Sequence, residues 1–208
     1  MADYTFFFNP MSRAQIGRWA LHEVGADYDP VLVDWQNKPA ALLAANPIGK
    51  LPTIIHHSAT GDHAVSEAAA VCHYLAEAEG SDLLPTPAEK ASYFRWLLFA
   101  AGPIEQATTA RAMGWVAPEG REGMLGYGSY DRMVETLEWW LKAHDFAAGA
   151  RFTMADVYLG SQVDWGLGFK TLPDLPAFAA YAERVRARPA YIEAKAIDMA
   201  LIAAAQNG

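Results

Sequence analysis

The residues best suited to chemistry lie in a four-residue turn near the start of the chain, Asn9-Pro10-Met11-Ser12. The three aromatic residues before the turn are typical of a buried strand. The apolar residues after it recur every three to four positions, which predicts a helix that starts at Ser12 and stops at Gly25. A hydroxyl at a helix N-terminus can stabilise an anion, because the free helix amides also favour negative charge. Serine is equally a common N-cap, so the turn is either a reactive site or a simple connector.

Composition excludes several classes of protein. The chain has 208 residues, of which 52% are hydrophobic and 19% are charged, so it can bury a substantial core. Its net charge of −8 argues against a nucleic-acid partner, and no apolar run is long enough to span a bilayer. A single cysteine excludes an internal disulfide framework. With no signal pattern at the start, we expect a cytoplasmic protein without a membrane partner.

The elements needed to position such a turn change type along the chain. Residues 1–80 read as β-α-β-α-β-β-α, a small α/β layer domain with one parallel and one antiparallel unit. Residues 81–87 contain two prolines and read as a linker. Residues 88–208 show helical periodicity throughout and predict an all-α domain. In that domain Thr153-Met154-Ala155-Asp156 is a capping-box variant, which is a folding signal and not a catalytic motif.

Five motifs in this order resemble a cytosolic glutathione transferase of the bacterial type, with a serine/asparagine turn in place of tyrosine or cysteine. They run through almost the whole chain and are "NPMSRAQIGRWALHEVGADY", "NPIGKLPTI", "VSEAAAVCHYLAEA", "FTMADV" and "RARPAY". The resemblance implies a thioredoxin-like N-terminal domain, glutathione as co-substrate, a homodimer and a role in detoxification. It implies no metal.

The resemblance also implies a glutathione site. In the family the proline that corresponds to Pro52 is cis, and the main-chain N–H and C=O of Leu51 would pair with the cysteinyl backbone of glutathione. Glu67 would meet the γ-glutamyl ammonium, while the same helix N-terminus suits the γ-glutamyl carboxylate. The chain departs from the family at Ala68, where many relatives have a hydroxyl, so either glutathione binding is weaker or Ser66 compensates for the lost contact. More simply, Pro52 could merely start a strand, and acidic residues favour the first turn of any helix.

Other assignments carried over from the family are less specific. Lys50, or Asn37 and Lys38, could meet the glycyl carboxylate. The expected wall of the electrophile pocket comprises Met11, Trp35, Met113 and Trp115, although a tryptophan is more often structural packing.

The family chemistry requires a thiol that ionises near neutral pH, because the thiolate is the nucleophile. Ser12 is the first candidate for the donor to the thiolate, because it has a hydroxyl. Asn9 is the second candidate, because it lies where theta-like relatives place their activating residue. The turn has no C-x-x-C, which excludes disulfide exchange through a protein dithiol. The single Cys72 is expected to be a buried small hydrophobe. His56, His57 and His63 flank a predicted hairpin without acidic or thiol partners at ligand spacing, so we expect no metal.

The main hypothesis is therefore a transferase that adds the glutathione thiolate to a hydrophobic electrophile. A glutathione-dependent isomerase or dehalogenase would share its first step. A non-catalytic glutathione-binding or regulatory protein on the same fold is the alternative from another class.

Overall fold

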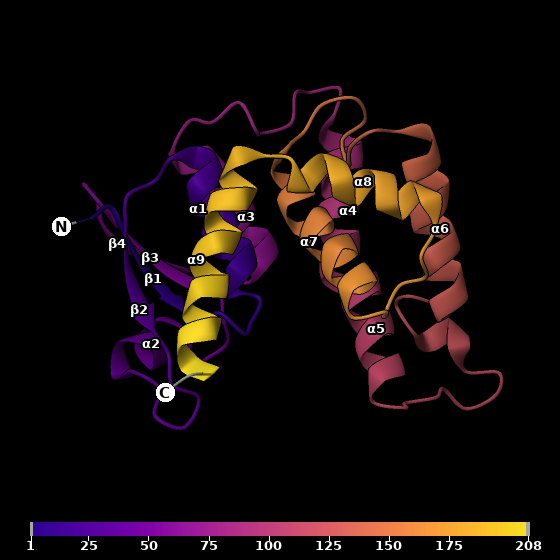
Figure 1. Cartoon of the computed structure of the whole chain (residues 1–208), viewed down its shortest axis with the longest axis horizontal. Coiled ribbons are helices and arrows are strands. Elements are labelled where there is room, and N and C mark those ends of the chain that lie inside the picture. Colours follow the sequence, from indigo (N-terminus) through magenta and orange to yellow (C-terminus); the bar gives the residue numbers. More distant parts are fainter. Residues whose placement is uncertain (1, 207–208) are drawn as a thin grey trace. The chain divides into compact units, whose positions relative to one another are not determined.

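The computed structural model describes residues 2–206, which form two compact units. The first unit combines the chain up to Leu84 with the chain from Ala187 onward. The second unit runs from Pro85 to Arg186. Figure 1 shows the helices and strands of the two units.

The first unit has a four-stranded mixed sheet in the order β2-β1-β3-β4. β1 pairs in parallel with β2, and the β1–β3 and β3–β4 pairs are antiparallel. This confirms the predicted element order and the thioredoxin-like fold. Its elements are β1 (Tyr4–Phe8), α1 (Ala14–Val24), β2 (Tyr28–Leu32), α2 (Ala40–Ala45), β3 (Thr53–Ser58), β4 (Gly61–Ser66), α3 (Ala68–Ala78) and α9 (Pro189–Gln206).

The helix after the turn forms close to its predicted limits. α1 ends as expected at Gly25, which adopts the left-handed conformation with φ of 67° that glycine tolerates best. It begins at Ala14, two positions after the predicted start, because Arg13 occupies the N-cap position. One face of α1, including Ile16 and Trp19, is buried in the core of this unit.

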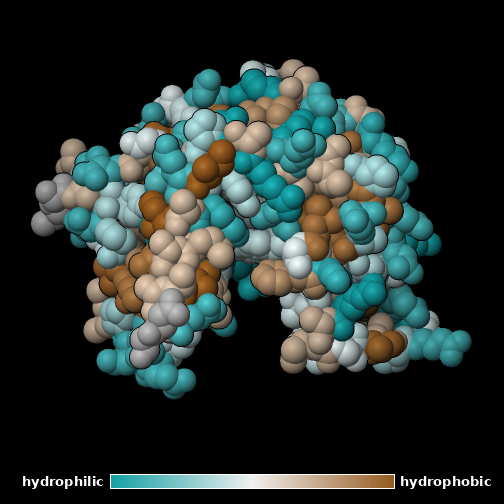
Figure 2. All heavy atoms as spheres, in the orientation of Figure 1, coloured by the Kyte–Doolittle hydropathy of each residue, from teal (hydrophilic) through white to brown (hydrophobic). Residues whose placement is uncertain are grey.

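α9 packs along α1, although it comes from the other end of the chain. Its buried residues are Ala194 and Asp198, and Ile192 and Met199 remain exposed. Hydrophobic side chains, in brown and tan, follow the face of α9 in view (Figure 2). α9 therefore belongs to the first compact unit, whereas the other helices of the predicted 88–208 domain belong to the second. Local periodicity identifies a helix but cannot indicate which unit it packs against.

The second unit is helical. Its helices are α4 (Lys90–Phe99), a π-helical turn (Ala100–Ile104), α5 (Glu105–Ala112), a short 3-10 helix (Glu122–Met124), α6 (Tyr130–Ala143), α7 (Met154–Gly168) and α8 (Pro176–Arg186). The π-helical turn contains Pro103, which has no amide to donate to the preceding turn. None of the helices in the described part of the chain is both long and apolar enough to cross a membrane.

α7 is the central helix of this unit, since nearly every residue in its first three turns is buried. The capping box at its start is confirmed: Asp156 Oδ2 accepts from Thr153 N over 2.9 Å. Asp156 Oδ1 also accepts from Ala147 N over 2.6 Å and from the Tyr181 hydroxyl over 2.8 Å. The carboxylate therefore joins α7 to α8 and to the loop before α7.

Candidate functional site

Strand register brings three separate segments to one end of the sheet. Thr53, the first residue of β3, pairs with Phe7 near the end of β1 and with Ser66 at the end of β4. The turn after β1, the loop before β3 and the start of α3 after β4 therefore meet at this end. These segments contain Asn9 to Ser12, Leu51–Pro52 and Ser66 to Ala68, the residues that the sequence predicted as a glutathione site.

The Leu51–Pro52 peptide bond is cis, as the family resemblance implied. The loop before it is held by Asn46, which is buried and whose side-chain amide donates to Lys50 O over 3.2 Å and to Thr53 Oγ1 over 3.1 Å. Thr53 Oγ1 in turn donates to Lys50 O over 2.8 Å. Within residues 2–206, the main-chain N–H and C=O of Leu51 have no hydrogen-bond partner. The loop thus presents one unpaired main-chain donor and one unpaired acceptor in a rigid frame.

The start of α3 presents polar groups beside this loop. Glu67 is exposed, precedes the helix and has a positive φ of 70°, which is uncommon for a residue other than glycine. A backbone in such a conformation is held by its surroundings and is often found where a ligand is clamped. Within residues 2–206 the Ser66 hydroxyl and the Glu67 carboxylate have no hydrogen-bond partner. Ala68 supplies only its main-chain amide.

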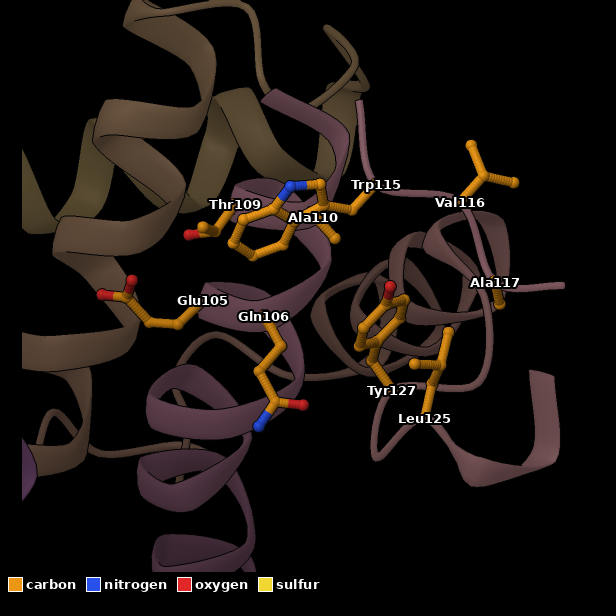
Figure 3. Close-up of a pocket in the computed structure, with 9 residues that line it drawn as sticks. All are labelled: Glu105, Gln106, Thr109, Ala110, Trp115, Val116, Ala117, Leu125 and Tyr127. Carbon is orange, nitrogen blue, oxygen red and sulfur yellow. The ribbon is translucent and has the colours of Figure 1, made fainter. Parts of the chain in front are cut away.

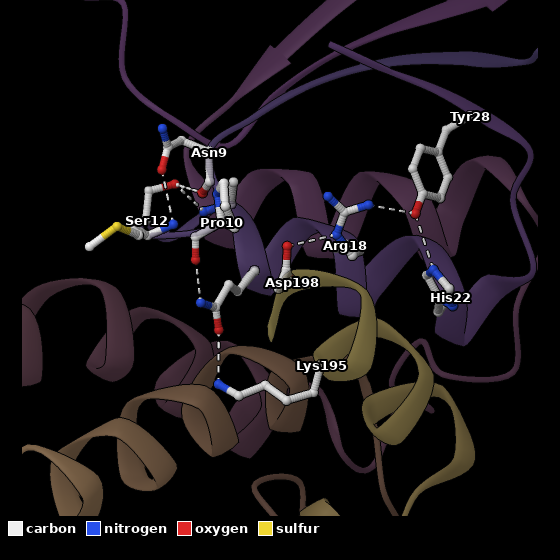
Figure 4. Close-up of polar contacts among 11 residues, drawn as sticks. Asn9, Pro10, Ser12, Arg18, His22, Tyr28, Lys195 and Asp198 are labelled. Carbon is white, nitrogen blue, oxygen red and sulfur yellow. Dashed lines mark hydrogen bonds and ion pairs between the residues drawn. The ribbon is translucent and has the colours of Figure 1, made fainter. Parts of the chain in front are cut away.

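The side chains of Asn9 and Ser12 stabilise the turn after β1 through hydrogen bonds (Figure 4). Asn9 Oδ1 accepts from Met11 N over 2.9 Å, and Asn9 Nδ2 donates to Val33 O over 3.0 Å. The Ser12 hydroxyl donates to Asn9 O over 2.7 Å and accepts from Ala14 N over 3.1 Å. Ser12 therefore performs a capping function at the start of α1, one position before the N-cap residue.

Donors of this turn that remain unpaired within residues 2–206 include the main-chain N–H of Ser12 and the second hydrogen of the Asn9 side-chain amide. Both side chains are half-buried. An anion at the start of α1 would thus find free donors from the turn, whereas the Ser12 hydroxyl would first have to leave Asn9 O.

The expected electrophile residues lie on the surface. Met11, Trp35, Met113 and Trp115 are 74%, 45%, 60% and 64% exposed. Of these, Trp115 lines a pocket of about 480 Å³ within the second unit, together with Glu105, Thr109, Leu125 and Tyr127. The indole of Trp115 lies across Thr109 and Ala110 of α5, and Leu125 and Tyr127 come from the segment that follows (Figure 3). Met113 is not part of this lining.

The two lysines expected near the glycyl carboxylate differ in setting. Lys38 is half-buried, and its side chain lies so close to Gly49 that a methyl group built there would be 3.0 Å from Lys38 Nζ. Gly49 precedes Leu51 by two residues, which puts the Lys38 ammonium at the same loop. Lys50 is exposed, as is Asn37.

The remaining reactive side chains have partners elsewhere. Cys72 is buried, as predicted, and burial raises the pKa of its thiol. His56 contacts the Tyr74 hydroxyl at 2.9 Å, His57 contacts Asp62 at 2.8 Å, and His63 contacts Thr60 at 2.9 Å. Within residues 2–206 no three histidine, cysteine or acidic side chains are grouped as metal ligands.

Comparison with known proteins identifies the family. The family model for the glutathione S-transferase N-terminal domain matches residues 10–78, and that for the C-terminal domain matches residues 128–189. Together they match more than half of the chain. The protein belongs to the glutathione S-transferase family.

Individual relatives agree with this assignment. The transferase is 25% identical over 191 residues to glutathione S-transferase GstA of Escherichia coli O157:H7. The aligned region covers 88% of this chain and 92% of the relative. The crystal structure of a glutathione transferase from Methylococcus capsulatus matches with a TM-score of 0.75 and 26% identity, over 94% of this chain and 98% of that one. A sphingomonad glutathione S-transferase complexed with glutathione matches with a TM-score of 0.72 and 26% identity, over 93% and 98%.

Some residues of the transferase's candidate site are not predicted by the sequence. The buried Asn46 is not among the site residues that the sequence predicts, although an asparagine before proline in an apolar segment is a signal for a buried hydrogen-bonding role. Gln15, on the first turn of α1, donates from its side-chain amide to Pro10 O. It had no sequence signal, because polar residues are ordinary on an exposed helix face.

Proposed function

We propose that the site at the end of the sheet binds glutathione and activates its thiol for attack on a hydrophobic electrophile. The observation that carries the proposal is the meeting of the three segments there through the β1–β3–β4 register. Each segment offers a different chemistry to a short peptide: unpaired main-chain groups, a helix N-terminus with an acid, and a turn with free donors.

Leu51 would bind the middle of the tripeptide. Its N–H and C=O have no partner within residues 2–206, so they can pair with the main chain of the cysteinyl residue as in an antiparallel strand. Asn46 and Thr53 would keep this segment in position by holding Lys50 O. Such rigid main-chain recognition would align the thiol toward the turn after β1.

The two ends of glutathione carry charges that the neighbouring segments complement. The γ-glutamyl ammonium would meet Glu67, and the γ-glutamyl carboxylate would meet the first amides of α3. The free Ser66 hydroxyl is available in place of the hydroxyl that Ala68 lacks. Lys38, beside Gly49, is the better candidate for the glycyl carboxylate than the exposed Lys50.

Catalysis would consist of stabilising the thiolate and presenting it to the electrophile. An ordinary thiol has a pKa of ~8.5, and donors directed at the sulfur lower that pKa. The Ser12 hydroxyl would donate to the sulfur after releasing Asn9 O, and the free hydrogen of the Asn9 amide would be the second donor. The α1 N-terminus adds its partial positive charge to both.

The electrophile pocket is proposed to lie in the second unit, beside α5. Its lining is mainly apolar and includes the Trp115 indole, as expected for a site that binds apolar groups. Replacement of Trp115 by alanine should raise the KM for an aromatic electrophile while the KM for glutathione stays unchanged. Equal changes in both constants would argue against this location.

The function is tested by glutathione binding and by the ionisation of the bound thiol. Binding would be measured by calorimetry with glutathione, with S-methylglutathione, and with cysteinylglycine, which lacks the γ-glutamyl group. Thiolate absorbance would be followed through a pH titration, and turnover screened with aryl halides, enals, isothiocyanates and peroxides. We expect weaker binding of cysteinylglycine and a bound-thiol pKa below that of free glutathione. No binding of glutathione at millimolar concentration would overturn the proposal.

Two observations favour the alternative of a binding or regulatory protein. The Ser12 hydroxyl is already bonded to Asn9 O, and Ala68 has no side-chain donor. Glutathione that binds with an unshifted thiol pKa would support this alternative. An isomerase or dehalogenase would show the shifted pKa but a different product, so product analysis separates it from the transferase.

We further propose that the protein is a cytoplasmic homodimer that acts in detoxification. Phe94 and Leu98 on α4 and Trp139 on α6 are large and 41%, 59% and 57% exposed. The guanidinium of Arg95 lies 5.6 Å from the Trp139 ring, which joins the two helices into one surface. A dimer would cover such side chains. Light scattering of the wild type and of Leu98→Glu tests this, and a monomeric wild type would contradict it.

A further inference from the structure

Several polar contacts join α9 and the residue before it to α1 in the first unit, among them a contact of 3.5 Å between His22 and Glu193. Arg188, just before α9, forms a bidentate pair with Glu23 near the end of α1, with both N–O distances 2.6 Å. Asp198 pairs with Arg18 at 2.9 Å in the middle of α1. Lys195 Nζ donates to Gln15 Oε1 over 2.9 Å on the first turn of α1. The last of these contacts leads to the turn after β1.

The contact of Lys195 continues into the turn that holds the candidate catalytic residues. Gln15 accepts from Lys195 through its oxygen, and its nitrogen donates to the main-chain carbonyl oxygen of Pro10. Figure 4 shows this chain of hydrogen bonds from Lys195 up to Pro10. A hydrogen bond to an ammonium is stronger than a neutral one and polarises the amide that accepts it. The amide of Gln15 is thereby a better donor to Pro10.

The Pro10–Met11 peptide unit is consequently held at both ends. Its oxygen accepts from Gln15 Nε2, and its N–H donates to Asn9 Oδ1 over 2.9 Å. The second bond fixes the Asn9 side chain, whose main-chain carbonyl in turn accepts from the Ser12 hydroxyl. The orientation of this one peptide unit therefore determines where both candidate donors lie.

We propose that Lys195 and Gln15 are positioning residues for thiol activation, so that the C-terminal helix sets the geometry of the Asn9–Ser12 turn. The inference rests on the proposed function, because it assumes that this turn stabilises the thiolate of glutathione. Neither residue needs to touch the tripeptide. Loss of the relay releases the Pro10 carbonyl, and the turn then samples orientations in which its donors point away from the sulfur.

Weaker packing of α9 on α1 is a different explanation for any effect of replacing Lys195. A variant at Arg188 distinguishes this explanation from the proposed relay to the turn. Arg188→Met removes a charged contact between the same two helices, but at the end of α1 far from the turn. Gln15→Glu gives the complementary variant. A carboxylate still accepts from Lys195 and keeps α9 docked, but it cannot donate to Pro10 O.

The experiment compares Lys195→Met, Gln15→Glu, Lys195→Arg and Arg188→Met with the wild-type full chain. We expect Lys195→Met and Gln15→Glu to raise the pKa of the bound thiol by about 0.5 unit or more, which lowers the thiolate fraction by up to about threefold at a pH below that pKa. Their affinity for S-methylglutathione, which has no ionisable thiol, should be unchanged. Lys195→Arg should restore the wild-type pKa, and Arg188→Met should lower thermal stability without moving it.

An unchanged thiol pKa in both Lys195→Met and Gln15→Glu would overturn the inference. Equal shifts in Lys195→Met and Arg188→Met would also overturn it, because docking of α9 would then explain the effect. These outcomes differ from failure of the proposed function, in which the wild type itself does not bind glutathione or binds it with an unshifted thiol.

Discussion

The Ser12 hydroxyl donates over 2.7 Å to the main-chain carbonyl of Asn9, so that the two candidate catalytic residues are bonded to each other. The hydroxyl has one proton, and in this arrangement that proton is not free for a thiolate. Asn9 has two side-chain donor hydrogens and uses one of them on Val33 O. To donate to sulfur, Ser12 must therefore break its hydrogen bond to Asn9 O, whereas Asn9 still has an unused side-chain hydrogen.

Ser12→Ala should lower kcat by roughly 10- to 100-fold, somewhat less than the loss of a fully dedicated oxyanion donor. Glutathione affinity should change little, because the contact matters mainly for the anion. Steady-state kinetics at saturating electrophile measure both constants. Ser12→Thr, which keeps the hydroxyl, is the matched control. Unchanged turnover in Ser12→Ala together with inactive Asn9→Ala would assign the donor role to Asn9.

Gly17→Ala should weaken glutathione binding through Pro52. A methyl group on Gly17 would lie 2.9 Å from Pro52 Cβ and 3.1 Å from the Phe6 ring, closer than side-chain carbons approach each other. The rigid proline ring must then move, and with it the neighbouring Leu51. We expect a loss of about 1–3 kcal/mol in the free energy of unfolding and a higher Kd for glutathione.

Gly102→Ala is the control for this prediction, because nothing lies within 4 Å of a methyl group at that helical position. Alanine favours a helix over glycine, so Gly102→Ala should be neutral or slightly stabilising. Tight glutathione binding by Gly17→Ala would show that the Pro52 loop moves without effect on the site.

Asp198→Ala should destabilise the protein by about 3–5 kcal/mol, because it leaves the Arg18 guanidinium buried without its counter-ion. Arg18 is 2% exposed, lies 4.4 Å from the Phe8 ring centre and donates to the Tyr28 hydroxyl over 2.9 Å. The double variant Arg18→Met/Asp198→Leu should lose much less, since no buried charge is left. Urea denaturation of the double variant and of its two single variants, Arg18→Met and Asp198→Leu, measures the coupling. Additive losses would contradict a functional ion pair.

Asp156 should make stability depend on pH in the acidic range. Burial raises the pKa of its carboxyl to about 6, from an ordinary value of 3.8. Between these values the folded state holds a proton that the unfolded state has released, so the free energy of unfolding falls as pH rises through that window. The slope is at most ~1.4 kcal/mol per pH unit. Urea denaturation from pH 4 to pH 7 measures it.

Asp156→Asn removes this titration and also leaves one main-chain donor facing an amide nitrogen. Its stability should be lower than that of the wild type at every pH, and its deficit should shrink as pH rises from about 4 to about 6. Asp145→Asn is the control, because that side chain is 69% exposed. An unchanged deficit across the range would mean that Asp156 is ionised throughout.

Local patterns in the sequence were sufficient for much of the fold. The aromatic strand at Tyr4–Phe8, the stop of α1 at Gly25 and the capping box at Thr153 each depend on residues only a few positions apart. Their free-energy differences arise within one turn or one strand, so the residue types alone predict them. The family motifs added the cis bond at Pro52 in the same way, by a contiguous segment.

Contacts between distant residues were decided only by the tertiary structure. The packing of α9 on α1 and the link from Lys195 through Gln15 to Pro10 had no local signal. Lys195 and Gln15 are 180 positions apart, and each is an ordinary polar residue in its own helix. The sequence by itself determined the elements, the order of the layers and the family. The fold decided which hydroxyl is occupied and which donors are free at the turn, because hydrogen bonds between remote segments exist only after those segments have packed.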